Sequence, residues 1–505
     1  MRTVLLILAI FLFSTNFNTH SQEKKINFSS KESKGITSNK RKFLILWNEV
    51  VFKHESSIMK CDSAIYERSN NSFIAYKNIE ITENDSLKIY GDSIHYYGDI
   101  QKAYIYGNVS VKSNKIKLNT PSLIYDKKKK IAYYKNGATV RDLEKGYKIE
   151  SQKGAFKTQI QSIFFKENVV LTHQDYKIIS DTLIYHTENQ RSDIIGNTEI
   201  ITNNSTIYSN KGWFDSQNNN ASFKGEVILK SKNQQLFADS VFYNEISGES
   251  YAEGNVLIKN DSAKIIIRGN YGIYNEITDS IKVWDNSIFT QLDSSDTINI
   301  YADQFIRYQD SLEELIICYN NVVINGNLIE GDCDSIYYNK TDSTLKCITD
   351  PIIWLDENQI TGRKIEFKIF DGEIFNMFVT NNSMIITRKD SIHYDQIKGE
   401  QINGHFKNNE LNILDVNKNG QAIYYTSEEK DSLINEINII SCESMKLHMN
   451  ENKIEKIKFY SKPDGKTLPL EGNGENIYLD DFKIISKRSY QEKKVVEKGD
   501  SPNGR

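Results

Sequence analysis

Apolar and polar residues alternate along this chain in short runs between turn residues, and one such run recurs about every 30 residues. Each copy is a turn residue followed by β-branched or aliphatic residues, as in GNVSV, KGEVILK and EGNVLIK. Steps of 29 residues separate the successive turn positions Asn168, Asn197, Glu226 and Asn255. A fixed period of this kind indicates one supersecondary unit stacked many times. The sequence therefore predicts a repetitive β-structure whose function depends on a long surface or groove.

A second phrase occurs in the same period, and it places an Asp two residues before an apolar residue and four before a Tyr. It reads GDSIHY to Tyr96, SDTLIY to Tyr185 and ADSVFY to Tyr243. In an extended strand Asp92, Ile94 and Tyr96 share one face. Because a buried Asp in every rung would be costly, we expect it at a bend or rim, accepting backbone N–H bonds. The pattern is strand, turn, strand, turn, with no helical period after the N-terminus.

The apolar runs of the first phrase are of two kinds. Val109 and Val111 alternate with Ser110, as in a half-buried strand. Continuous apolar runs begin at Val169, Val227, Val256 and Val322. Such runs are either covered on both faces or have one face that meets something apolar. Two interpretations stay open: strands between two packed layers, or two sheets splayed into a trough whose apolar interior carries an acyl chain.

The N-terminus has the features of a cleavable signal peptide, which we assign to residues 1–21. Arg2 supplies the positive charge, Val4 to Phe13 the apolar core, and the core is too short to span a membrane. We therefore expect an exported chain. The domains expected after it are a polar leader over 22–42, regular repeats over 43–325, diverged repeats of the same type over 326–485, and a disordered tail over 486–505.

Composition argues against most other functions. A net charge of −4 with interspersed signs gives no basis for nucleic-acid binding. The eight His are scattered, and no zinc spacing, nucleophile elbow, phosphate loop or dinucleotide motif occurs, so we expect no catalytic residue, cofactor or metal site. One Asp per ~30 residues is too sparse for a calcium ladder. The five Cys are either buried free thiols or include a Cys333–Cys347 pair.

The signal peptide, the Asp-Ser phrase and the Gly-Asn-Val phrase together resemble the OstA family. This family includes the lipopolysaccharide-transport proteins LptA and LptC and the N-terminal domain of LptD. The resemblance covers residues 43–325 well and 330–479 weakly. It implies an all-β fold, an elongated repetitive antiparallel β-jelly roll. The chain is longer than a single-module relative and shows no sequence for a C-terminal transmembrane β-barrel. It is therefore similar to a long Bacteroidota-type member without a barrel.

The resemblance also implies a function. We expect a non-catalytic periplasmic bridge protein that binds lipopolysaccharide through lipid A and carries it from the inner to the outer membrane for outer-membrane assembly. The expected partners are an LptC-like protein at the inner membrane and an LptD-like protein at the outer membrane, docked edge to edge. The residues expected to line the lipid groove are Val109, Val111, Val169, Leu171, Val227, Leu229, Val256 and Ile258, with Ile94, Tyr96, Leu183, Tyr185, Val241 and Tyr243 opposite or beside them.

Two other functions fit the repeat. A secreted parallel β-helix, either an adhesin or a polysaccharide-active protein, would also show a regular period with Asn and Val. A closed structural β-roll of the envelope would show the same strands without any cargo. Bound lipid would separate the bridge protein from both alternatives.

Overall fold

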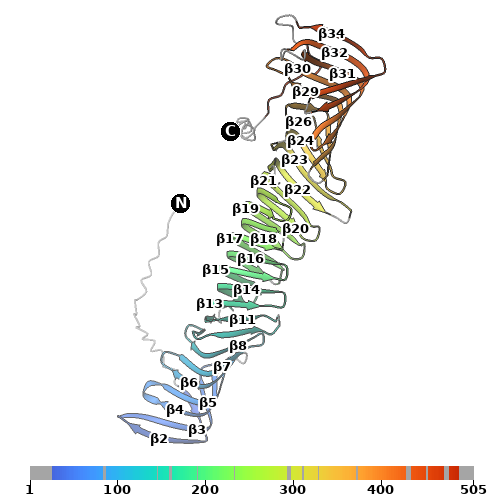
Figure 1. The fold of residues 1–505 in the computed structure, drawn as a ribbon. Helices are drawn as coiled ribbons and strands as arrows, with labels where there is room; N and C mark the ends of the chain where they lie inside the picture. The colour runs from blue at the N-terminus through green and yellow to red at the C-terminus, as the bar shows by residue number, and fades with distance from the viewer. Residues whose placement is uncertain are drawn as a thin grey trace, which may run out of the picture. The chain divides into compact units, whose positions relative to one another are not determined.

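The computed structural model describes residues 26–83, 87–144, 146–157, 162–189, 191–215, 217–232, 234–292, 297–309, 312–327, 329–370, 373–427, 434–450, 453–470 and 477–487. The expected signal peptide and residues 488–505 of the expected tail lie outside these ranges. The chain divides into two compact units, Met1–Glu188 and Asn189–Arg505. Each unit is described by itself below, and its strands can be followed in Figure 1.

In the first unit, long strands pair antiparallel with their neighbours in sequence, and four short strands, β9 to β12, interrupt this order. At the first interruption, β8 pairs with β9 through one half and with β10 through the other. The elements are β1 (Asn27–Ser29), β2 (Glu32–Ser38), β3 (Arg41–His54), β4 (Ser57–Glu67), the 3-10 turn η1 (Arg68–Asn70), β5 (Ser72–Glu83), β6 (Leu87–Tyr97), β7 (Lys102–Lys112), β8 (Ile116–Asp126), β9 (Ile131–Tyr134), β10 (Ala138–Asp142), β11 (Lys148–Ser151), β12 (Lys153–Lys157), β13 (Ser162–Thr172) and β14 (Tyr176–His186).

In the second unit, the same antiparallel order runs without interruption from β15 to β24. The strands are β15 (Arg191–Thr202), β16 (Ser205–Asp215), β17 (Asn220–Ser231), β18 (Gln234–Asn244), β19 (Glu249–Asn260), β20 (Ile265–Asn275), β21 (Ser280–Leu292), β22 (Thr297–Gln309), β23 (Glu314–Asn325), β24 (Ile329–Asn339), β25 (Thr344–Ile348), β26 (Ile352–Leu355), β27 (Asn358–Thr361), β28 (Lys364–Phe370), β29 (Glu373–Arg388), β30 (Tyr394–Lys407), β31 (Glu410–Ser427), β32 (Ile434–Asn450), β33 (Lys453–Tyr460) and β34 (Asp464–Pro469).

The long strands of both units bend at a β-bulge near their middle. In β7 the bulge consists of Gly107 and Asn108, with φ of 74° and 46°, and the register with β8 shifts there. Two residues in the left-handed region thus oppose one residue of the neighbouring strand, which sharply bends the bulged strand. Ala103 and Ile105 before the bulge and Val109 after it all belong to one buried cluster. The two halves of the sheet are therefore folded toward a common apolar interior.

Both sequence phrases meet at this bulge. Asp92 of the second phrase lies in β6, which pairs with β5 on one side and with β7 on the other. It is the single residue opposite the bulge of β5, and it accepts a hydrogen bond from Asn108 Nδ2 in the bulge of β7 at 3.0 Å. The same bond joins Asn78 to Asp62 at 2.9 Å, Asn255 to Asp239 at 3.0 Å and Asn321 to Asp303 at 3.1 Å. The Asp lies at a bend, as predicted, but in these four cases its hydrogen-bond donor is a side-chain amide rather than the expected backbone N–H. The 29-residue period therefore corresponds to one hairpin of two strands.

The prediction of an all-β, repetitive, antiparallel fold is confirmed. Every strand pairing described in the two units is antiparallel, which contradicts the parallel β-helix. No membrane-spanning helix is found among the described residues. All five Cys are free and buried, so the Cys333–Cys347 disulfide is absent from this structure. Burial raises the pKa of the Cys318 thiol to about 12.

Strand pairing begins earlier than the sequence suggests. β1 and β2, within the expected polar leader, pair with the two halves of β3, and every residue in both strands is exposed. With neither face buried, these strands carry no apolar alternation that would reveal them. The change of pattern near Asn325 has a structural counterpart, because β24 pairs with two short strands, β25 and β26, in place of one bent strand.

Candidate functional site: the apolar interior

The interior faces of the strands carry the residues that the sequence predicted for a lipid groove. The structure buries eleven of the fourteen: Val109, Val169, Leu171, Val227, Val256, Ile258, Ile94, Tyr96, Leu183, Tyr185 and Val241. The other three, Val111, Leu229 and Tyr243, are half-buried. Burial places these side chains on the inner faces; their contact with lipid stays a prediction.

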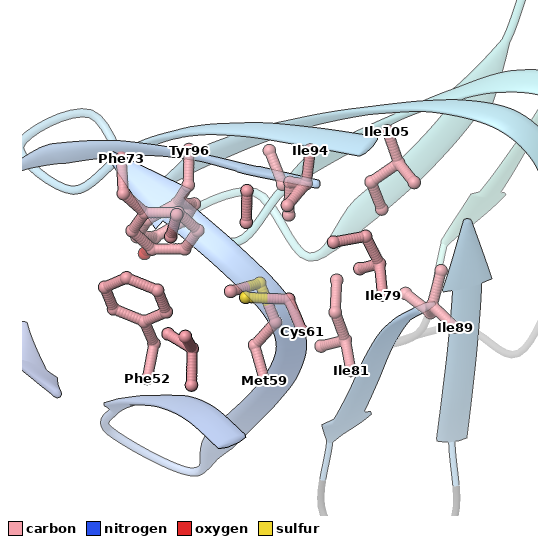
Figure 2. Close-up of a cluster of buried hydrophobic side chains, with 14 of the residues drawn as sticks. Phe52, Met59, Cys61, Phe73, Ile79, Ile81, Ile89, Ile94, Tyr96 and Ile105 are labelled. Carbon is pink, nitrogen blue, oxygen red and sulfur yellow. The ribbon is translucent and has the colours of Figure 1, made fainter. Parts of the chain in front are cut away.

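In the first unit, one part of the interior is filled by side chains. Figure 2 shows aromatic and aliphatic residues from β3 to β7 packed together. The rings of Phe52 and Phe73 stack with centroids 4.0 Å apart, and Tyr96 lies 5.2 Å from Phe73. Tyr96 Oη and His54 Nδ1 are 2.6 Å apart, so the buried hydroxyl has a polar partner. This cluster leaves Ile94, Tyr96 and Val109 packed against protein side chains.

A second part of the same interior is hollow. A cavity of about 730 Å³ lies next to the packed cluster, within the size range of ligand pockets. Of the groove residues predicted from the sequence, only Val111 lines it. Its apolar walls are Leu87, Ile89, Val111, Ile116, Leu118, Leu123, Tyr125, Ala132, Tyr134, Phe156 and Ile163.

The tyrosines of the cavity wall are neutral. Burial and then the nearby charge of Glu83 raise the pKa of Tyr125 to about 12. Burial also raises the pKa of Tyr134 to about 12, although its hydroxyl bonds to Ser151 Oγ at 2.6 Å. These two side chains therefore present uncharged aromatic surface to the cavity at neutral pH.

Charged residues at the cavity are paired with one another. Lys127 Nζ donates to His54 O at 2.9 Å and to Ser57 Oγ at 2.8 Å, and it lies 3.3 Å from Glu55 and 4.0 Å from Glu83. The side chain of Lys127 is 10% exposed. A lysine this buried requires such partners, because an unpaired charge would be strongly destabilising. The arrangement joins the turn after β8 to the turn after β3 beside the cavity.

In the second unit, the burial of the inner-face side chains decreases with distance from the bulge. Residues next to the bulges, such as Val227 and Val256, are buried, whereas Leu229 and Leu236, farther along the half-strands, are half-buried. The half-buried residues of this face that the sequence analysis missed include Ile207, Leu236, Ile265, Phe289 and Ile300. The sequence did contain a signal for residues of this kind, because apolar and polar residues also alternate at the start of the strands that carry the second phrase. Ile265 and Ile267 before Gly269, and Ile298 and Ile300 before Ala302, are examples.

The continuous apolar runs of β17 and β19 have their middle residue on the outer face. Ile228 and Leu257 both face Phe237 across the strands, and all three are half-buried. Lys259 Nζ lies 5.6 Å from the Phe237 ring centroid, so its stem and charge cover this aromatic side chain. In these strands the outer apolar residues therefore form a small cross-strand group under lysine.

The chemistry of this interior is that of apolar binding. No group of three or more His, Cys, Asp or Glu that could hold a metal ion is present in the described part of the chain. The polar groups beside the cavity are hydrogen-bonded to one another, as given above for Lys127. The site can thus exclude water from aliphatic chains.

The chain was compared with known proteins. Residues 24–181 match the family model described as OstA-like protein, and residues 206–373 match that of the LptA/(LptD N-terminal domain) LPS transport protein. No curated protein matches the chain.

Among solved structures, the chain is similar to LptH from Pseudomonas aeruginosa, the LptA-homologous periplasmic component of the lipopolysaccharide transport device, at 13% identity. The match covers 22% of this chain and 81% of that one, with a TM-score of 0.21, too low to support an argument. The two family matches, on the antiparallel repeats described above, carry the assignment. Over residues 24–181 and 206–373 this chain belongs to the OstA-like, LptA/LptD N-terminal domain family of lipopolysaccharide-transport β-jelly rolls.

Proposed function

We propose that this protein binds the lipid A acyl chains of lipopolysaccharide in its apolar interior and forms part of a periplasmic bridge between the inner and outer membranes. The observation that carries the proposal is the inner face itself. Each unit presents apolar side chains on both halves of its bent strands, and in the first unit they surround a cavity of about 730 Å³. The family assignment supports lipopolysaccharide as the cargo.

Burial of acyl chains supplies the binding energy without covalent chemistry. Each CH₂ group removed from water contributes roughly 0.8 kcal/mol. Because Val227 and Leu229 of β17 have counterparts in Val256 and Ile258 of β19, binding is similar from one position to the next. Cargo can then move along the interior, because no single position binds it much more tightly than the next. The proposed role is therefore transport from the inner to the outer membrane, and it is non-catalytic.

The proposed partners dock at strand edges. β1 and β2 pair with β3 alone among the described strands of the first unit, which leaves their outer backbone groups available. In the second unit β33 and β34 pair only with β32 within the described residues. Such edges are templates for an added strand. We propose that LptC-like and LptD-like β-jelly rolls occupy them in the periplasm.

Site-specific photo-crosslinking in cells tests the cargo. A photoreactive residue at Leu229 on the inner face is compared with one at Lys230, the next residue on the outer face. The pair Val111 and Lys112 repeats the comparison beside the cavity. We expect lipopolysaccharide adducts at Leu229 and Val111 alone. No adducts at either apolar position, in exported and folded protein, would favour a closed structural roll.

A further inference from the structure

On the outer face of β26, β27, β29, β30 and β31 in the second unit several side chains are buried, unlike those of an ordinary solvent-facing strand surface. Residues 477–487 follow β34 in sequence and lie on this face. Trp354 of β26 is 7% exposed and Ile386 of β29 is 2% exposed, and the register places both on the same face as Gln359 of β27. We call residues 477–487 the clasp.

Two buried glutamines hold the clasp by its backbone. Gln396, with no exposed surface, donates from Nε2 to Ile477 O at 3.1 Å and accepts from Leu479 N at 2.8 Å. Gln359, 5% exposed, donates from Nε2 to Lys483 O at 2.8 Å and accepts from Ile485 N at 2.9 Å. Each side-chain amide therefore forms two hydrogen bonds to the clasp backbone, one to the C=O group of one residue and one to the N–H group of the residue two positions later.

Side chains of the clasp add apolar and acidic contacts. Ile477 and Leu479 pack against the buried cluster of Ile423, Tyr425 and Ile437. The central part of the clasp meets one lysine, because Lys398 Nζ donates to Asp480 O and to Asp481 Oδ2, each at 2.8 Å. At the far end Lys487 pairs with Glu330 of β24. Within the clasp the rings of Tyr478 and Phe482 stack with centroids 4.1 Å apart.

From these contacts we infer that the outer face of β27, β30 and β31 is a binding site for an extended peptide, which the chain fills with its own clasp. The ligand class is an extended segment with two apolar residues spaced two apart and an acidic residue two positions after the second of them. The backbone is recognised by Gln359 and Gln396, and the acidic side chain of Asp481 by Lys398. The clasp of a second copy fits the same site. This inference is independent of the proposed lipid cargo.

The geometry favours an exchangeable ligand over a further rung of the sheet. No strand is assigned over residues 477–487, and glutamine side chains take the place of ladder hydrogen bonds. Seven residues, 470–476, separate β34 from the clasp in the sequence. So short a tether gives an effective concentration on the order of millimolar, which keeps even a weakly binding segment in place. A peptide in trans then competes only after the tether is cut.

The test uses the full chain with a protease recognition sequence in place of residues 471–476. The probe is a fluorescent synthetic peptide with the sequence of residues 477–487, followed by fluorescence anisotropy before and after cleavage. We expect uptake of the probe only after cleavage, and competition by unlabelled peptide but not by a scrambled one. Gln359→Ala with Gln396→Ala should weaken uptake roughly tenfold or more, since two buried amides lose their bonds. Gln401→Ala, at an exposed position of β30, is the matched control.

Two results would overturn the inference. One is that the cleaved chain, with its melting temperature unchanged, takes up no probe even after prolonged incubation at millimolar peptide. The other is that cleavage exposes the amides of β29–β31 to hydrogen exchange throughout these strands, because the clasp would then be an integral part of the fold. Uptake that is equal in the Gln359→Ala, Gln396→Ala variant and the Gln401→Ala control also contradicts the assigned recognition.

Discussion

Two groups of strands in the second unit, β15–β23 and β24–β34, share the bulge but differ on their outer faces. In the first group Ile228, the middle residue of an apolar run, is half-buried beside Phe237. In the second group Ile386, which also follows a bulge in an apolar run, is 2% exposed at the clasp-covered face. The same sequence pattern thus has two physical meanings, and what covers the outer face decides between them.

This difference answers part of the question raised by the continuous apolar runs. At the terminal strands the run is covered on both faces, as the packed-layer interpretation requires. In β17 and β19 the second face is only partly covered, by neighbouring side chains and lysine stems. For these strands the proposed cargo binds on the apolar inner face.

The largest expected effect comes from emptying the interior of the regular strands. Phe305 of β22 is 1% exposed and stacks on Phe289 with ring centroids 5.4 Å apart. We expect Phe305→Ala to lower the free energy of unfolding by about 3–5 kcal/mol, because a buried ring leaves a cavity. Urea denaturation of the full chain measures this. Phe242→Ala, at a 39% exposed outer position, is the control, and equal losses in both would show that the interior is not the core.

The covered outer face should respond more strongly than the open one. We expect Ile386→Ala to cost about 2–4 kcal/mol, since a fully buried side chain is truncated. Ile228→Ala, at a half-buried outer position of β17, should cost about 1 kcal/mol. Thermal unfolding of the two variants compares them directly. Equal costs would remove the distinction between the two groups of strands.

The bulge itself gives the next prediction. Gly254 has φ of 77°, and an added Cβ would overlap the carboxylate of Asp239. We expect Gly254→Ala to destabilise by about 1–3 kcal/mol through backbone strain and this overlap. In an Asp239→Ala background the cost should fall, because the contact with the carboxylate, the closest of the overlaps, is removed. The terminal strands have Asn381 at the position equivalent to Gly254, with φ of 61°, and Asn381→Gly should be nearly neutral. A double-mutant cycle by chemical denaturation checks the coupling.

The smallest expected effects on stability come from two carboxyl groups whose pKa values are shifted in opposite directions. Burial raises the pKa of Glu314 in β23, but the hydrogen bonds and charges of Arg307 and Lys340 outweigh it and lower the pKa below its usual 4.5. Burial raises the pKa of Asp395 in β30 above its usual 3.8, and Lys389 and the Tyr425 N–H only partly offset it.

The signs of the two pH dependences are therefore opposite. The contribution of Glu314 is present above pH 4.5 and is lost as the pH falls through its lower folded pKa, so Glu314→Gln should destabilise at neutral pH by about 1 kcal/mol or less. The contribution of Asp395 is fully present below pH 3.8 and is lost as the pH rises through its higher folded pKa. Asp395→Asn should be neutral or stabilising at pH 7. Denaturation at several pH values would contradict this if both variants shifted the same way.

Much of the fold was predictable from the sequence because each rung repeats the same local signals. The Asn and Gly of the first phrase mark the left-handed bulge, and alternation identifies inner residues such as Val109 and Val256. The cavity was harder to predict. Of its walls, Ile116 and Leu118 belong to a strand without the Asp-Ser phrase, and Phe156 to a short strand that interrupts the order. A cavity forms where the surrounding side chains are too small to fill the space between them. The repeat pattern of the sequence does not show where this occurs.

The clasp could not be predicted either. Its contacts join Gln359 to Lys483 and Gln396 to Ile477, over separations of 124 and 81 residues. No local pattern signals a contact at that distance, and the glutamines resemble ordinary polar positions of a strand. The exposed strands β1 and β2 were missed for a different reason, because they bury no face.

The pairing of neighbours in sequence from β15 to β24 bears on how the protein is made. Each hairpin closes only a short loop, so the entropic cost of every step is small and folding is fast for a β-protein. Strands can then be added in the order in which they are synthesised, each on the edge of the one before. Gain or loss of one 29-residue hairpin preserves the direction of all following strands, so such a protein can change in length by whole hairpins while its remaining rungs keep their register.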